Sequence, residues 1–237
     1  MKQNNEYLEQ YDQQLKQELG KGISGWLRKI MDRRAQAMGQ RDRHALFLKR
    51  VLEMTGLSTI NKSIKVLEIG CGNGWAISYF SPNIECYAID IGNFYGESLK
   101  NRGVKFVTLD VNENNLPYQD QVFDLVMLNH VIEHISNYER LLKELHRVSL
   151  NGGYVYIRTP DIARVGYLFF EDYTHIKPYT MNSLNSMMGA YGFKPIIGLF
   201  SDHARINLDV ITNGRMRPLV FSKVLGGKEV EGLFQKV

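Results

Sequence analysis

The stretch Val66-Leu67-Glu68-Ile69-Gly70-Cys71-Gly72-Asn73-Gly74 decides the fold of this chain, because a short apolar run ends there in three alternating glycines. The apolar run predicts a buried strand. The glycines predict a tight turn that a ligand can approach closely, since glycine has no Cβ and accepts positive φ. Glu68 stands two residues before the first glycine, where the strand leaves the sheet. We therefore expect a ligand site at the end of this strand.

Strand-like and helix-like segments alternate along the chain from residue 64 onward. Strands are predicted at 64–69, 84–89, 105–109, 123–128, 154–158, 194–199 and 207–212. Helices are predicted at 75–80, 95–102, 137–148 and 183–191. Repeated β-α units build a parallel sheet with helices on both faces and with ligands at the carboxyl ends of the strands. The sequence therefore predicts an α/β, Rossmann-like fold with a seven-stranded, mostly parallel sheet, whose last two strands form an antiparallel hairpin.

Apolar residues at helical spacing also precede this sheet, and they predict helices at 5–19, 23–38 and 44–54. We assign residues 1–60 to an N-terminal helical extension or lid, 61–213 to the α/β domain and 214–237 to a basic C-terminal tail. The formal net charge of +4 is concentrated toward the two ends. Basic ends suit an anionic substrate, a nucleic acid or an anionic membrane surface, and solvated helix faces are the alternative.

The composition is that of a water-soluble globular protein, with 44% hydrophobic and 23% charged residues. No run approaches the roughly 18 apolar residues of a membrane span. The polar start of the chain lacks the apolar core of a signal peptide. Cys71 and Cys86 are the only cysteines, too few for a disulfide framework. We expect a cytoplasmic protein, with peripheral membrane contact and the oligomeric state left open.

The glycine-rich stretch resembles motif I of the class I S-adenosylmethionine (SAM)-dependent methyltransferases, E/D-x-G-x-G-x-G. The dinucleotide fingerprint G-x-G-x-x-G would instead require glycine where the chain has Trp75. The resemblance extends from Val66 to Pro160 and is to the small-molecule O-methyltransferase branch of the class. It implies that SAM is the cofactor and that methyl transfer is the reaction.

Polar residues that end the predicted strands match the cofactor positions of this class. Asp90 ends the second strand, where a carboxylate can accept hydrogen bonds from both ribose hydroxyls. The resemblance implies that Asp110 and Val111 contact the adenine and that Asn129 and Glu68 face the methionine moiety. Helix capping or turn formation is the alternative for each polar residue. The predicted cofactor-binding residues are Glu68, Gly70, Cys71, Gly72, Gly74, Asp90, Ile91, Asp110, Val111 and Asn129.

The segment His130-Val131-Ile132-Glu133-His134 follows the fourth predicted strand. It is similar to the family's E-V-I/L-E-H segment, with His130 in place of the glutamate. It also spells the zinc-peptidase signature H-x-x-E-H, which we reject because that signature needs a helix within a protease framework. Some relatives bind a divalent metal through this segment and a later histidine, whereas Glu133 and His134 can equally cap and orient the next helix. We assign no metal.

His175 lies in a segment that resembles the H-x-x-P-Y/F-T stretch bordering the acceptor pocket in small-molecule methyltransferases. Histidine suits the removal of a proton from a hydroxyl acceptor, because its unperturbed pKa is near 6.5. We predict His175 as the catalytic base and His134 as the second candidate, with a structural hydrogen-bonded histidine as the alternative. The apolar segment 162–170 is expected to line the acceptor pocket or to pack on the N-terminal helices.

These observations favour a SAM-dependent methyltransferase that acts on a hydroxyl of a small or medium-sized acceptor of the sugar, lipid-linked or secondary-metabolite type. Arg158 and Arg164 are candidates for contact with an anionic acceptor. Methylation of RNA or another nucleic acid is an alternative, although the chain has no N-P-P-Y-type motif and no recognisable RNA-binding module. A non-catalytic SAM-fold binding protein is the other alternative, and the retained glycines and acidic residues argue against it.

Overall fold

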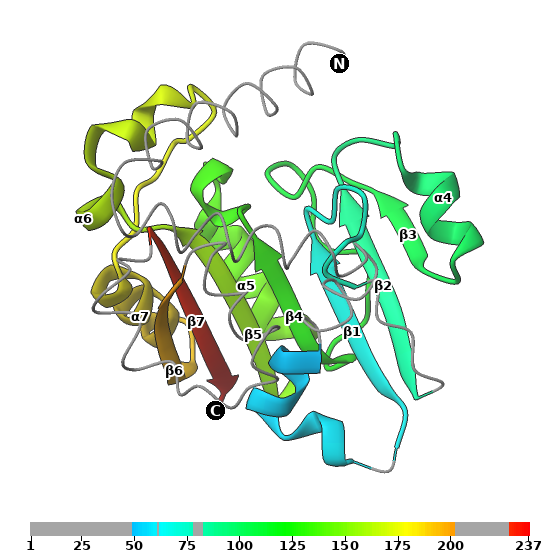
Figure 1. Cartoon of the computed structure of the whole chain (residues 1–237). Helices are drawn as coiled ribbons and strands as arrows, with labels where there is room; N and C mark the ends of the chain where they lie inside the picture. The colour runs from blue at the N-terminus through cyan, green and yellow to red at the C-terminus, as the bar shows by residue number, and fades with distance from the viewer. Residues whose placement is uncertain (1–48, 61, 78–82, 202–227) are drawn as a thin grey trace, which may run out of the picture.

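The computed structural model describes residues 49–60, 62–77, 83–201 and 228–237, without the side chains of residues 199–201. Its strands form a seven-stranded sheet in the order β3-β2-β1-β4-β5-β7-β6 (Figure 1). The strands are β1 (Ile64–Ile69), β2 (Ile84–Asp90), β3 (Lys105–Thr108), β4 (Phe123–Asn129), β5 (Ser149–Pro160), β6 (Phe193–Ser201) and β7 (Glu229–Lys236). The predicted α/β, Rossmann-like sheet is confirmed.

Strands β1 to β5 run parallel to their neighbours, whereas β7 lies antiparallel between β5 and β6. The carboxyl ends of the parallel strands therefore meet at one edge of the sheet, the upper edge in Figure 1. β4 is buried along its whole length. An apolar, fully buried strand is typical of a sheet that helices cover on both faces.

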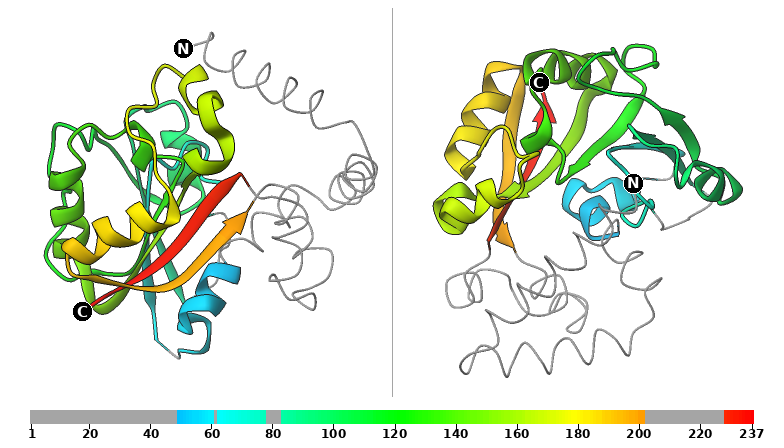
Figure 2. Two further views of the ribbon diagram at one scale, coloured as in Figure 1. Left: turned by 90° about the vertical axis from the view of Figure 1, so that its left-hand side faces the viewer. Right: turned by 90° about the horizontal axis from the view of Figure 1, so that it is seen from above.

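Helices pack on the two faces of the sheet (Figure 2). α5 (Tyr138–Val148) and α7 (Met181–Ala190) bury their apolar sides in one core cluster with β4 and β5. α4 (Gly96–Asn101) and the helical residues 49–55 contribute to a second cluster on the opposite face. The short elements are η1 (Leu57–Thr59), η2 (Ile132–His134), α6 (Ile162–Val165) and η3 (Gly166–Glu171). Side-chain caps begin the longer helices, with Asn137 at α5 and a Thr180–Ser183 capping box at α7.

The main departure from the sequence prediction concerns the C-terminal residues. β6 has an antiparallel partner as predicted, but that partner is β7 at Glu229–Lys236, which we had placed in a basic tail. The charged residues of this segment made it look solvent-exposed. In the structure they are buried with partners, as when Lys236 Nζ donates to the carbonyl of Ser149 at 3.0 Å. Residues 229–236 therefore belong to the sheet.

Smaller differences occur elsewhere. β5 starts at Ser149, earlier than the predicted 154, and its pairing with β4 shifts register between Phe123 and Leu125. Residues 75–77 form no helix. The predicted helices at 5–19 and 23–38, most of the one at 44–54, residues 78–80 and the predicted strand at 207–212 lie outside the described residues. Where the chain is described, no helix combines the length and the apolar character that crossing a membrane requires.

Candidate active site

The glycine loop (residues 70–74) directly follows β1, at the edge of the sheet where the parallel strands end. Gly70, Gly72 and Gly74 have positive φ values of 68°, 50° and 71°. A Cβ added at Gly70 would overlap the side chain of Val131, and one at Gly74 would overlap Leu99. A Cβ at Gly72 would meet no atom of the described residues within 4 Å. Two glycines are thus required by packing, and the third faces open space.

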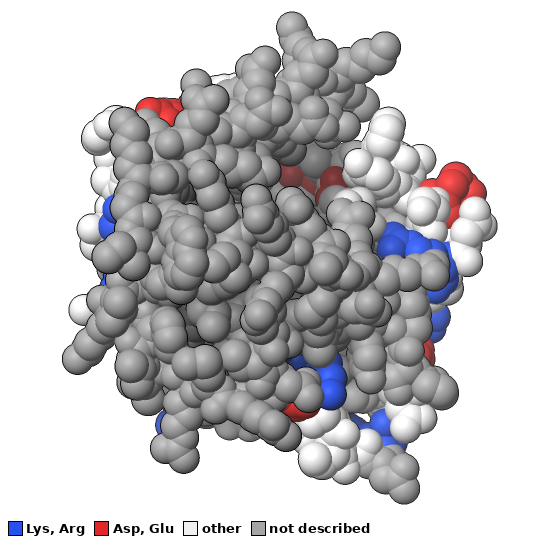
Figure 3. Space-filling view, viewed as in Figure 1, with Lys and Arg blue, Asp and Glu red and all other residues white. Residues whose placement is uncertain are grey.

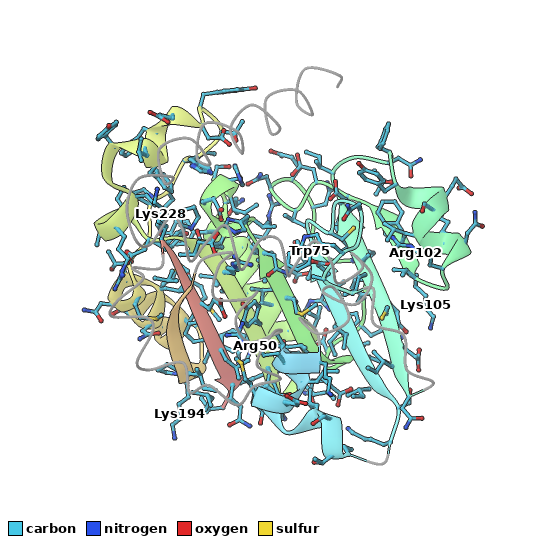
Figure 4. All side chains as sticks on the ribbon, viewed as in Figure 1. Arg50, Trp75, Arg102, Lys105, Lys194 and Lys228 are labelled. Atoms are coloured by element: carbon cyan, nitrogen blue, oxygen red, sulfur yellow. The ribbon has the colours of Figure 1, made fainter. Side chains whose placement is uncertain are left out.

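Arg102, which sequence reasoning did not single out, braces this loop from the end of α4. Its guanidinium donates to the carbonyl of Asn73 at 2.6 Å. Arg102 and Lys105 lie on the β2–β3 side of the sheet in Figure 4, where Figure 3 shows basic side chains on the surface. Lys105 pairs there with Glu85 at 2.9 Å. The sequence gives little indication that Arg102 contacts the glycine loop, because an arginine that follows a helix is usually solvated.

Glu68 and Asn129 lie at the ends of the neighbouring strands β1 and β4. The amide of Asn129 donates to Glu68 Oε1 at 3.1 Å, and both side chains are buried. Burial raises the pKa of Glu68 to about 8, although the hydrogen bond from Asn129 acts in the opposite direction. Glu68 Oε2 and Asn129 Oδ1 are buried acceptors that have no hydrogen-bond partner among the described residues. An ammonium group such as that of the SAM methionine moiety is the kind of donor that would satisfy them.

Asp90 ends β2 beside the glycine loop. Its Oδ2 accepts from the backbone N–H of Gly72 at 2.8 Å and its Oδ1 from that of Gly92 at 2.9 Å. An ionised carboxylate has about four lone-pair sites, so each oxygen keeps one for a further donor. The next residue, Ile91, is an apolar side chain that is 70% exposed. A ribose with two hydroxyls and an apolar ring beside it fits this arrangement.

The other predicted cofactor residues lie along the same sheet edge. The N–H of Leu109 donates to the carbonyl of Asp90 at 2.9 Å, which brings the end of β3 next to β2. Asp110 Oδ1 accepts from the N–H of Asn112 at 2.8 Å, and Val111 is buried. Cys71 is also buried, and burial raises the pKa of its thiol well above the ordinary range. The structure thus brings all ten predicted residues to the carboxyl ends of β1 to β4.

The acceptor loop (residues 172–178) is attached to η2, just beyond β4. The carbonyl of Glu133 accepts from the N–H groups of Ile176 and Lys177 at 2.8 and 3.1 Å. These bonds bring together the two predicted catalytic residues, His134 and His175, whose ring centroids lie 4.8 Å apart. We call these two residues the histidine pair.

Backbone carbonyls fix the tautomer of both rings. His175 Nδ1 lies 2.7 Å from the carbonyl oxygen of Phe169, so this nitrogen carries the proton. His134 Nδ1 lies 3.1 Å from the carbonyl oxygen of Thr174 and 3.0 Å from its hydroxyl, which itself donates to Asp172 Oδ1 at 2.6 Å. His134 must therefore also donate through Nδ1. In both rings the lone pair remains on Nε2.

Glu133, His134 and His175 each offer a ligand atom, and these atoms lie within 4.8 Å of one another. Oε2 of Glu133 accepts from the Thr159 hydroxyl at 3.0 Å, and Oε1 makes an ion-pair contact of 3.3 Å with Nδ1 of His130. That these residues hold no metal stays a prediction. Ile132–His134 is a single 3-10 turn, so the helix of a zinc-peptidase signature is not formed.

The two core arginines differ in exposure, since Arg158 is buried whereas the Arg164 side chain is 33% exposed. Arg158 is 1% exposed and its guanidinium pairs with Glu229 at the start of β7. Arg164 Nε lies 3.2 Å from Asp161 Oδ2. The suggestion that Arg158 contacts the acceptor is therefore wrong. Glu229 was not identified from the sequence as a residue near the site, because its partners His130 and Arg158 lie far away in the sequence.

This sheet order, with a glycine loop and acidic strand ends at one edge, defines a SAM-dependent methyltransferase domain. Residues 39–196 match the methyltransferase domain family. The chain belongs to that family. The predicted enzyme class and the predicted cofactor SAM are confirmed.

Curated relatives match part of the chain. A demethylmenaquinone methyltransferase of Anoxybacillus flavithermus is 30% identical over 132 residues, which are 51% of this chain and 56% of that protein. One from Staphylococcus aureus is 32% identical over 125 residues, 48% of this chain and 49% of that protein. This chain therefore spans only about half the length of these relatives.

Solved structures share the fold over a larger part of the chain. A SAM-dependent methyltransferase of Archaeoglobus fulgidus superimposes with a TM-score of 0.59 at 20% identity and covers 81% of this chain and 94% of its own. A SAM-dependent methyltransferase of Aquifex aeolicus superimposes with a TM-score of 0.53 at 20% identity and covers 81% of this chain and 91% of its own. At these identities the likeness establishes the fold alone.

Proposed function

We propose that this protein transfers a methyl group from SAM to a hydroxyl of a small or medium-sized acceptor, with the histidine pair as proton acceptor. The observation that carries this proposal is the tautomer of the two rings. Both hold their proton on Nδ1, against a backbone carbonyl, and keep a basic Nε2. An imidazole nitrogen with a free lone pair, on a residue that follows the carboxyl end of β4 or is bonded to η2, suits the removal of a hydroxyl proton.

SAM supplies an activated methyl group on a sulfonium, so the chain has to align the acceptor and remove its proton. His175 is the first candidate for that proton, because its Nδ1 is held against the Phe169 carbonyl and its Nε2 lies 3.8 Å from Asp172 Oδ2. Asp172 then stabilises the imidazolium that forms. His134 is the second candidate.

Exposed apolar side chains around the histidine pair support an acceptor with an aromatic or apolar body. Phe169 packs against the His175 ring at 4.5 Å between centroids. Residues from η3 through the acceptor loop add apolar surface, namely Tyr167, Phe170, Tyr173 and Ile176. The relatives are named for demethylmenaquinone, a quinone whose reduced form bears ring hydroxyls. Removing such a proton activates the oxygen and also the conjugated ring carbon, so one base serves either site of methylation.

The test is transfer of isotope-labelled methyl from SAM to a panel of hydroxylated acceptors, including reduced quinones. We expect His175→Ala to lower kcat on the order of 100-fold or more with SAM affinity unchanged, as for loss of a general base. His146→Ala is the matched control, since His146 packs against Phe193 away from the site. Equal turnover in His175→Ala would return His175 to a structural role, and SAM binding without any transfer would support a non-catalytic binding protein.

A further inference from the structure

His130, which follows β4 directly, has an unusual backbone. Its φ is 53°, and among the described residues the only other non-glycine residue with a positive φ is Gln121. A residue with a Cβ seldom adopts this conformation, and it persists where surrounding contacts hold it in place. The contacts of the His130 ring identify what holds it.

Both nitrogens of the His130 ring face carboxylates. Nδ1 lies 3.3 Å from Oε1 of Glu133 in η2, and Nε2 lies 3.2 Å from Oε1 of Glu229 at the start of β7. A neutral imidazole has a single N–H, whereas two carboxylate partners require a proton on each nitrogen. The geometry therefore fits the charged imidazolium, which bridges two elements far apart in the sequence.

Further carboxylates and cations lie near His130 among the described residues. Glu229 also pairs with Arg158 of β5, and Glu231 accepts from Arg50 at 3.0 Å. Arg50 reaches the sheet from the helical residues 49–55 (Figure 4). With Glu133 and His130, this gives three carboxylates and three cations at the β5–β7 side of the site.

His130 is the cation of this group whose proton leaves at mildly alkaline pH. The His130 side chain is 37% exposed, and its partial desolvation lowers its pKa, but the carboxylates of Glu229 and Glu133 outweigh that effect and raise it to about 9. An arginine keeps its proton throughout this range. A rise in pH beyond this pKa leaves the two carboxylates of Glu133 and Glu229 without the cation between them.

The residues on either side of His130 reach both halves of the site. Asn129 donates to Glu68, and Val131 packs against Gly70 of the glycine loop. Glu133 holds the acceptor loop through its carbonyl. Any displacement of this segment therefore moves the histidine pair relative to the cofactor residues.

We propose that His130 is a positioning residue, which as an imidazolium ties Glu133 of η2 to Glu229 of β7 and so fixes the histidine pair relative to the glycine loop. This inference rests on the proposed function of that pair. His130 itself removes no proton from the acceptor, because both of its nitrogens are engaged. Its effect on catalysis passes through the placement of His134 and His175.

The test is a pH titration of the full chain with isotope-labelled histidines, followed by NMR and needing no acceptor. We expect the His130 resonance to titrate near pH 9 and those of the histidine pair to shift with the same midpoint. Glu229→Gln keeps the shape and removes one negative charge, so it should lower the midpoint by about one pH unit or more. His130→Asn tolerates the left-handed backbone and removes the charge. At pH 7 the histidine-pair resonances of the His130→Asn variant should match those that the unaltered protein shows above pH 9.

His146 is the internal control, because it packs against Phe193 and should show no transition near pH 9. A His130 midpoint near the unperturbed 6.5 would overturn the proposal. So would histidine-pair resonances that stay constant while His130 titrates. Neither outcome depends on methyl transfer, so failure of the proposed function appears separately, as undiminished turnover of His175→Ala.

Discussion

The glycine loop permits a quantitative test, because its glycines differ in what surrounds them. Gly70 and Gly72 have positive φ, as does Gly103 on the far side of α4, and an alanine at any of the three must adopt a left-handed conformation. That costs roughly 1–2 kcal/mol. At Gly72 and Gly103 the described part of the chain places no atom within 4 Å of the added Cβ. At Gly70 it overlaps the branched side chain of Val131, which adds roughly 1–3 kcal/mol of overpacking.

Gly103→Ala and Gly72→Ala should therefore each lower the free energy of unfolding by about 1–2 kcal/mol, and Gly70→Ala by about 2–5 kcal/mol. Urea unfolding followed by circular dichroism measures these differences. Adding Val131→Ala removes the obstructing methyl groups, so the double variant Gly70→Ala/Val131→Ala should lose less stability than the sum of the single changes.

SAM affinity should follow a different order from stability. Gly72→Ala fills the open space beside Asp90 and should weaken binding about tenfold or more, which is about 1.4 kcal/mol. Gly103→Ala should bind SAM like the unaltered protein. Calorimetric titration with SAM separates the two. Equal stability of Gly70→Ala and Gly103→Ala, or equal SAM affinity of Gly72→Ala and Gly103→Ala, would refute the assignment of packing and ligand roles within the loop.

Three shorter predictions concern the acidic residues. Asp90→Ala should weaken SAM binding roughly 100-fold through loss of charge-assisted hydrogen bonds, and unchanged binding would remove Asp90 from the site. Because burial raises the pKa of Glu68 to about 8, the free protein should lose stability as the pH rises from 4.5 toward 8. At pH 7, SAM binding should release a proton in calorimetry across buffers, and Glu68→Gln should abolish that release. Chelation should leave turnover intact, since Glu133 already has His130 and Thr159 as partners; activity restored by added divalent ions would contradict this.

The cofactor half of the site was predictable because its residues act next to their own strands. Glu68, Asp90 and Asn129 each end a strand of recognisable apolar pattern. Parallel strands bring their carboxyl ends to one edge, so order along the chain already implies proximity in space. The adjacency of His134 and His175 followed from resemblance, and the backbone bonds between Glu133 and the acceptor loop are its physical cause.

The C-terminal strand was not predictable on the same grounds. Glu229, Glu231 and Lys236 read as solvated residues of a tail, because charged side chains are seldom buried unless they are paired. Their partners are Arg158, Arg50 and a carbonyl in β5, and no local pattern connects these positions. Burial of such a strand becomes evident only once the long-range ion pairs are known.

The two halves of the site thus depend on the chain in different ways. The residues of the cofactor edge each lie at or directly after the end of their own strand, where local sequence patterns identify them. The acceptor side is held through His130 and Glu229 by a strand that joins the sheet from the far C-terminus. A change in β7 can therefore alter how the histidine pair is placed relative to the glycine loop. Acceptor preference can then diverge among chains that keep the same glycine loop, since the residues that fix the acceptor side lie outside it.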